Sequence, residues 1–74
     1  MQETPPLPPN KLKQLRESRE LKLYDLAAHL RVDPATIHRW ERGESAMPDW
    51  AKLSLAEFFD VGPGYLMGWE REAA

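Results

Sequence analysis

The chain has 74 residues and a mass of 8.6 kDa, which is enough for one small domain and excludes a multidomain enzyme. Hydrophobic residues make up 42% of the chain and charged residues 30%, a composition typical of a folding protein. There is no cysteine, which excludes disulfides, cysteine-based zinc sites and a thiol nucleophile. Because no apolar run approaches the roughly 20 residues that span a bilayer and no secretory signal is present, we expect a cytoplasmic protein.

The net charge of −2 conceals an uneven distribution of charge along the chain. Residues 10–42 hold eight basic and five acidic side chains, a net charge of +3. The rest of the chain holds two basic and seven acidic side chains, a net charge of −5. The basic front half is compatible with a nucleic-acid partner, and the acidic back half favours a protein contact.

The chain begins with a proline-rich segment and then a helix start. Residues 1–9 contain four prolines, which predict an extended, flexible N-terminal arm. Asn10 is a candidate N-cap for a first helix that runs to about Arg19, with Leu12 and Leu15 in its apolar stripe. We expect the folded domain to cover residues 10–69 and a short tail to cover residues 70–74.

The next two helices are short and closely spaced. Four apolar residues at the spacing of one helical face predict the second helix: Leu23, Leu26, Ala27 and Leu30. Asp33 and Pro34 are typical of a helix start, so a third helix should run from Pro34 to about Arg42, where Gly43 ends it in a left-handed conformation. Two short helices joined by a tight turn form a helix-turn-helix pattern.

Two further helices are predicted, and no strand pattern appears, so the expected class is all-α with five helices. Pro48 and Asp49 begin the fourth helix, whose apolar face is expected to hold Trp50, Leu53 and either Ala56 or Glu57. Gly62 and Pro63 begin a fifth helix that runs through Met67 and ends at Gly68. Both Trp40 and Trp50 are expected in the core.

The two sides of the third helix differ in chemistry. Ile37 and Trp40 face the second helix. The opposite side carries one methyl group, one imidazole and two guanidinium groups, from Ala35, His38, Arg39 and Arg42. Arginine can donate two hydrogen bonds to guanine, and alanine can contact the thymine methyl group. This side of the helix therefore predicts recognition of bases in the major groove.

At this point a family resemblance becomes specific. Four segments carry it: K-L-K-Q-L-R-E-S-R-E-L from Lys11, L-A-A-H-L-R-V from Leu26, T-I-H-R-W-E-R-G from Thr36, and L-A-E-F-F-D-V-G-P-G-Y-L-M-G from Leu55. Residues 11–68, about four-fifths of the chain, resemble the DNA-binding domain of Cro/C1-type (Xre-like) regulators, the family of the lambdoid phage repressors. The resemblance implies a compact five-helix lambda-repressor-like fold, with the third helix in the major groove and the second across the backbone.

The resemblance also implies a role for particular residues. Base-reading positions carry over onto Pro34, Ala35, Thr36, His38 and Arg39. Positions that contact the DNA phosphates carry over onto Lys22, Leu23, Arg42, Gly43, Glu44 and Ser45. An ion pair between Arg16 and Glu41 is expected as well, and the helix pattern agrees, because a carboxylate on the inner face needs a partner.

The chain departs from the family pattern at several turns. Arg31 stands where the family has glycine between the second and third helices, and Glu20 and Asp60 also replace common glycines. A left-handed arginine costs roughly 1 kcal/mol, unless this turn differs. Lys22 and Leu23 replace a serine or threonine and a glutamine, so a lysine could take over the glutamine–phosphate contact.

No catalytic or metal site is indicated. His29 has no companion at metal-ligand spacing, and Gly62-Pro63-Gly64 follows no strand, so it is a helix-start turn and not a phosphate loop. Since no nucleophile, base and pocket converge, we expect no enzyme activity, no cofactor and no small-molecule substrate.

We therefore predict a small sequence-specific transcriptional regulator, such as a phage or prophage repressor or a Cro-like protein, at the bacterial nucleoid. One domain reads only a half-site, so a homodimer on a pseudo-palindrome is expected, with recognition helices about 34 Å apart. The candidate dimer contact comprises Tyr65, Leu66, Met67 and Trp69. The alternative is a protein-binding module on the same fold, an antitoxin or an accessory adaptor, which substitution of Arg39 would leave unaffected.

Overall fold

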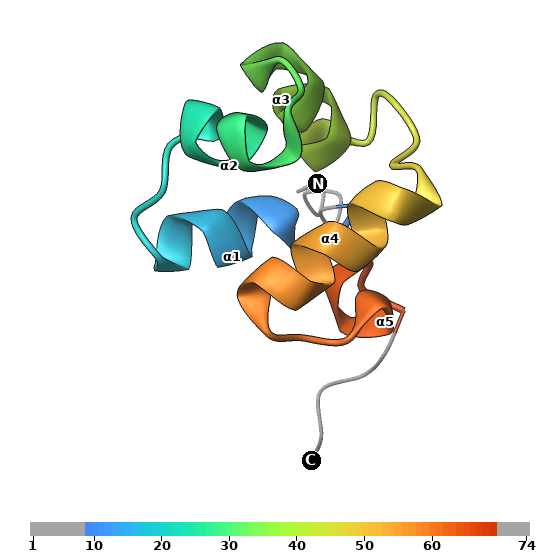
Figure 1. Ribbon diagram of the computed structural model, residues 1–74. Coiled ribbons are helices and arrows are strands. Elements are labelled where there is room, and N and C mark those ends of the chain that lie inside the picture. The colour runs from blue at the N-terminus through green and yellow to red at the C-terminus, as the bar shows by residue number, and fades with distance from the viewer. Residues whose placement is uncertain (1–8, 70–74) are drawn as a thin grey trace, which may run out of the picture.

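The computed structural model describes residues 9–69, and these form five helices and no strand (Figure 1). The helices are α1 (Leu12–Ser18), α2 (Leu23–Leu30), α3 (Pro34–Arg42), α4 (Asp49–Phe59) and α5 (Pro63–Leu66). The predicted all-α class and helix order are confirmed. Apart from Pro9, the predicted arm lies outside the described residues, and so does the predicted tail. Within residues 9–69, no helix is long and apolar enough to cross a membrane.

Every helix contributes to one core. In Figure 1, α2 and α3 lie side by side above α1 and α4, and α5 lies beneath α4. The most extensive helix–helix contacts are those of α2 with α3 and of α4 with α5. The largest fully buried side chains come from all five helices: Leu12, Leu26, Ile37, Leu55, Phe59 and Leu66. A helix of four to eleven residues cannot bury an apolar face alone, so the five elements are mutually dependent.

Two polar side chains connect helix ends that are distant in sequence. The Asn10 amide oxygen accepts a hydrogen bond from the Leu12 N–H at 3.0 Å, and its amide nitrogen donates to the Trp40 carbonyl at 2.8 Å. The N-cap position of α1 is Lys11, one residue after the predicted Asn10, but the Asn10 side chain bonds the first N–H of α1 and holds this helix against the end of α3. Arg19 donates to the Phe59 carbonyl at 2.8 Å and so connects the end of α1 with the end of α4.

Left-handed residues end most of the helices. Glu20, Arg31 and Asp60, which follow α1, α2 and α4, have φ angles of 55°, 59° and 57°. The predicted left-handed arginine is thus present in the turn between α2 and α3. Gly43 ends α3 as predicted, with φ 73°. At the three non-glycine positions the conformation costs about 1–2 kcal/mol each, because Cβ approaches the following carbonyl oxygen.

The predicted apolar face of α4 is wrong at Trp50 and Leu53, but Ala56, one of its two alternative members, is buried. Trp50 and Leu53 are 51% and 60% exposed, whereas the buried face consists of Ala51, Leu55, Ala56 and Phe59. Ala51, Leu55 and Phe59 recur every four residues, as expected for one helical face, and Ala56 lies beside them. The two alanines are small, so the larger side chains of Trp50 and Leu53 were assigned to the apolar face instead. Trp40 is buried as predicted, and Trp50 contacts the edge of its ring, with centroids 6.2 Å apart.

Candidate nucleic-acid interface

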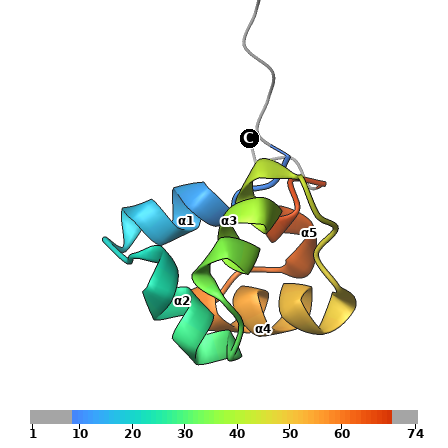
Figure 2. The same cartoon turned by 90° about the horizontal axis from the view of Figure 1, so that it is seen from above.

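The outer side of α3 is the exposed polar surface that the sequence predicts. Ile37, Trp40 and Glu41 are buried against the rest of the domain. The side chains of Ala35, His38, Arg39 and Arg42 are all exposed, and Thr36 is half-buried at the border. In Figure 2, which views the molecule from above, α3 lies toward the viewer over the other helices. The domain therefore presents two guanidinium groups and an imidazole from one exposed helix.

A buried ion pair fixes the orientation of α3. Arg16 Nε lies 2.6 Å from Glu41 Oε2, and Arg16 Nη2 donates to Glu41 Oε1 at 3.3 Å. The Glu41 side chain is only 1% exposed. A third guanidinium nitrogen donates to the Leu21 carbonyl at 2.9 Å. The hydrogen bond with Glu41 raises the pKa of Arg16 against the opposing effect of burial, so the arginine stays charged. The predicted pair is confirmed, and it joins α1, α3 and the turn before α2.

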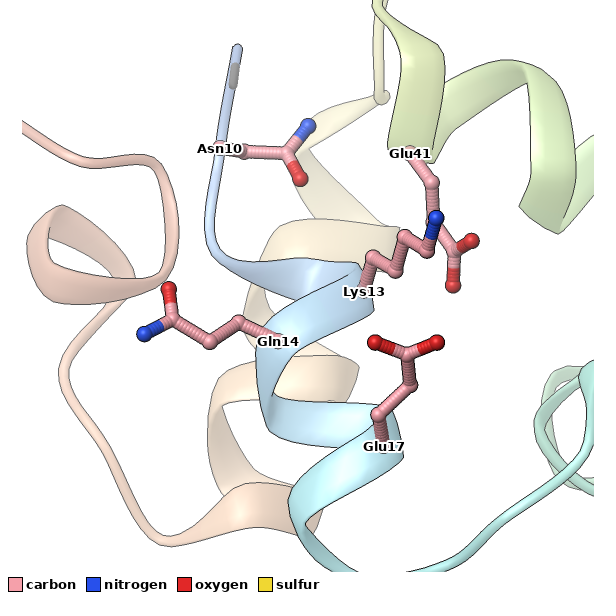
Figure 3. A pocket seen from close by; sticks show the side chains of 5 residues that line it. All are labelled: Asn10, Lys13, Gln14, Glu17 and Glu41. Carbon is pink, nitrogen blue, oxygen red and sulfur yellow. The ribbon is translucent and has the colours of Figure 1, made fainter. Parts of the chain in front are cut away.

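A shallow groove lies beside this pair. It has a volume of about 280 Å³ and runs between α1 and α3, lined by Asn10, Lys13, Gln14, Glu17 and Glu41 (Figure 3). Asn10 and Glu41 are already hydrogen-bonded within the domain. Among residues 9–69, every buried side-chain nitrogen or oxygen has a hydrogen-bond partner. Two of the five lining side chains are therefore committed to the fold, and the other three are exposed on α1.

The two exposed arginines of α3 have different neighbours. Arg39 donates a hydrogen bond of 3.3 Å to the Thr36 hydroxyl, one turn earlier on the same helix. Arg42 forms an ion pair with Glu44, with Nε and Oε2 2.9 Å apart, and both side chains are about half exposed or more. The neutral hydroxyl leaves the charge of Arg39 intact, whereas the carboxylate offsets that of Arg42.

The loop after α3 uses its first backbone groups to end the helix. The Gly43 N–H donates to the Trp40 carbonyl at 3.2 Å, and the Glu44 N–H donates to the Arg39 carbonyl at 2.9 Å. Gly43 and Glu44 are positions that the family resemblance implies for phosphate contact, and their N–H groups are engaged in the helix cap. Ser45 follows them and is half-buried.

The start of α2 carries the other phosphate candidates. Lys22 is exposed, and its N–H donates to the Asp25 carboxylate at 2.7 Å, which fixes the first turn. Leu23 is half-buried against the core, so its side chain belongs to the fold. Tyr24, which the sequence reasoning did not single out, is 59% exposed in this first turn. The sequence could have indicated this exposed ring, because Tyr24 lies next to Leu23 and off the apolar face that Leu23 and Leu26 define.

The remaining candidates are divided between core and surface. Leu66 is fully buried, so its predicted role in a dimer contact is wrong: its side chain packs in the domain's own core. Tyr65 and Met67 are half-buried, and Trp69 is 69% exposed. His29 is exposed and contacts the Phe58 ring at 4.6 Å. Within residues 9–69, no group of three or more possible ligand side chains could hold a metal ion.

A family model described as a helix-turn-helix domain matches residues 10–65, from Asn10 into α5. No curated protein matches the chain. The match covers α2, α3 and the turn between them, together with the helices that support them.

Proposed function

Because the chain belongs to the helix-turn-helix domain family, we propose that it is a sequence-specific DNA-binding regulator of transcription of the Cro/C1 (Xre-like) type, encoded by a phage or prophage. Membership of this family supports DNA as the partner, and we take that DNA to be a double-stranded operator. One observation supports sequence reading in particular: the exposed side of α3 carries no large apolar residue and presents Arg39 beside Thr36 and His38. Such donors and acceptors match base edges in the major groove.

The proposed contacts divide into base reading and positioning. Arg39 would read guanine, His38 and Thr36 would assist it, and Pro34 and Ala35 would offer only apolar contact, such as to a thymine methyl group. Lys22, Arg42 and Ser45 would bind phosphates and so set the register of the domain on the duplex. Leu23 could contribute only its backbone at the start of α2, where the helix dipole favours an anion. No chemical step is needed, because occupancy of the site is the activity.

We further propose that two copies bind a pseudo-palindromic operator. One α3 spans only a few base pairs, and a two-fold axis doubles the sequence read without new elements. The contact between copies would use the exposed Trp69 together with Tyr65 and Met67, at the end of the domain that holds α5 (Figure 1). Leu66 has no surface to contribute.

Selection of bound sequences from a random DNA pool tests this function. Wild-type protein should recover an inverted repeat whose half-sites lie about 34 Å apart. The Arg39→Ala variant should lose preference at one base position, by about 1–3 kcal/mol. The charge-matched control Lys13→Ala, outside α3, should keep the same preference. An Arg39→Ala pool identical to the wild-type pool would contradict the proposal. Recovery of a single half-site by the wild-type protein would reject the proposed dimer but not the reading of DNA.

A second function, a protein-binding module, rests on a different observation. Trp50, Leu53 and Trp69 are each more than half exposed, so their apolar side chains are available for contact with another protein. An antitoxin or adaptor would use them to contact another protein. In that case Arg39→Ala would change nothing, whereas Trp50→Ala would abolish the complex.

A further inference from the structure

The position of Glu44 is fixed by the way α3 ends. Gly43 turns the chain in the left-handed conformation, and the Glu44 N–H then donates to the Arg39 carbonyl at 2.9 Å. Pro9 covers the turn so closely that a Cβ on Gly43 would lie 2.9 Å from the Pro9 Cβ. This backbone directs the chain back toward the last helical turn, where Glu44 meets Arg42.

The fold gives little reason for an acid at this position. Glu44 lies beyond the C-terminus of α3, where the helix dipole disfavours negative charge. Its ion pair with Arg42 is exposed, with side-chain exposures of 62% and 49%, and pairs of this kind contribute little to stability. The buried pair of Arg16 with Glu41 already joins α3 to α1. The Arg42–Glu44 pair therefore affects the surface charge more than the fold.

We propose that Glu44 competes with the DNA phosphates for Arg42 and thereby weakens the sequence-independent affinity of this domain for DNA. The inference rests on the proposed DNA-binding function. A phosphate that approaches Arg42 must displace a carboxylate 2.9 Å away, and it also meets the negative charge of Glu44. Arg39 needs no such exchange, because its partner is the neutral Thr36 hydroxyl. Glu44 thus lowers the share of the binding free energy that comes from phosphate attraction and raises the share that comes from the contacts of Arg39.

Equilibrium binding of a labelled duplex of arbitrary sequence, measured by fluorescence anisotropy over a range of salt concentrations, tests the proposal. The variants are Glu44→Gln, Arg42→Gln and the double variant. Glu57→Gln is the matched control, because Glu57 is an exposed acid on α4 and its substitution changes the net charge equally. Circular dichroism verifies that each variant is folded.

We expect Glu44→Gln to bind roughly three- to tenfold more tightly than wild type, with a salt dependence steeper by up to about one released ion. Glu57→Gln should give a smaller gain. In the Arg42→Gln background the gain from Glu44→Gln should fall to the level of the control. Equal gains for Glu44→Gln and Glu57→Gln, or a gain that persists without Arg42, would overturn the proposal.

The role of Glu44 and the DNA-binding function can be rejected separately. If wild type binds DNA and Arg39→Ala loses its base preference, but Glu44→Gln behaves as the control does, only the role of Glu44 is rejected. If neither wild type nor Glu44→Gln binds duplex DNA, there is no phosphate contact to compete for, and both proposals are rejected together.

Discussion

At the scale of single residues, one buried carboxylate controls how α3 is held. Replacing Arg16 by methionine would leave Glu41 almost fully buried without its partner. Breaking a buried pair in this way costs about 3–5 kcal/mol, a large share of the stability of a small domain. We expect Arg16→Met to lower the midpoint of urea unfolding sharply.

The double variant Arg16→Met/Glu41→Leu provides the control for this prediction. It removes both charges and leaves apolar side chains in their place, so it should recover much of the lost stability. A single Arg16→Met variant as stable as wild type would show that the pair does not hold the helices together.

The left-handed residues make a prediction of the opposite sign. Arg31 and Asp60 have φ angles of 59° and 57°, a conformation that glycine adopts without strain. Replacing either with glycine should stabilise the domain by about 0.5–1 kcal/mol and raise Tm by a few degrees. Arg31→Ala, which keeps a Cβ, should give no such gain in the same thermal melt. A lower Tm for both glycine variants would contradict the assignment of these turns.

Single residues also show what the sequence could and could not predict. Gly43 was predictable because it follows a helix end, and the Arg16–Glu41 pair because the family resemblance implies it and Glu41 lies on the inner face of its helix. The roles of Trp50 and Leu66 were not. Trp50 was assigned to the core because of its size. Its burial depends on which side of α4 faces the other helices, and the small Ala51 occupies that side.

At the scale of elements, the ends of α1 and α4 depend on each other through Arg19. The sequence indicates this residue only as the expected end of the first helix and as one of the basic residues of the front half. The structure shows its guanidinium at the last carbonyls of α4, 2.8 Å from the Phe59 oxygen, and near the Phe59 ring. A contact 40 residues apart in the chain leaves no local pattern to detect.

Arg19→Ala should therefore destabilise the domain without touching the candidate interface. The loss of charge-assisted hydrogen bonds to carbonyls is expected to cost about 1.5–3 kcal/mol. Thermal unfolding measures the loss, and Lys13→Ala, which removes an exposed charge from the same helix, serves as the control. If both variants melt alike, Arg19 is an ordinary surface charge.

The elements themselves were largely predictable. The boundaries of α2 and α3 agree with the sequence because each has a clear apolar face and a turn residue at its end. The buried face of α4 was not predictable in the same way, because it mixes alanine with leucine and phenylalanine. The exposed side of α3 follows from the same periodicity that fixes its buried side.

At the scale of the whole molecule, the acidic net charge is compatible with the proposed binding of DNA. The charge of −2 sums over all faces, whereas binding depends on one face, where Arg39 and Arg42 are exposed. A domain with so few exposed cations there should bind arbitrary DNA weakly and depend on base contacts. The family match and the outer side of α3 thus support the same reading.

Mapping backbone amide chemical shifts on addition of a selected duplex tests the central claim most directly, and a chain of 8.6 kDa suits the measurement. The account predicts that the largest shifts fall at the start of α2, along the exposed side of α3 and at Ser45. It also predicts that the middle of α4 stays unperturbed. Shifts confined to Trp50, Leu53 and Trp69, with α3 unaffected, would contradict the claim that α3 reads the DNA.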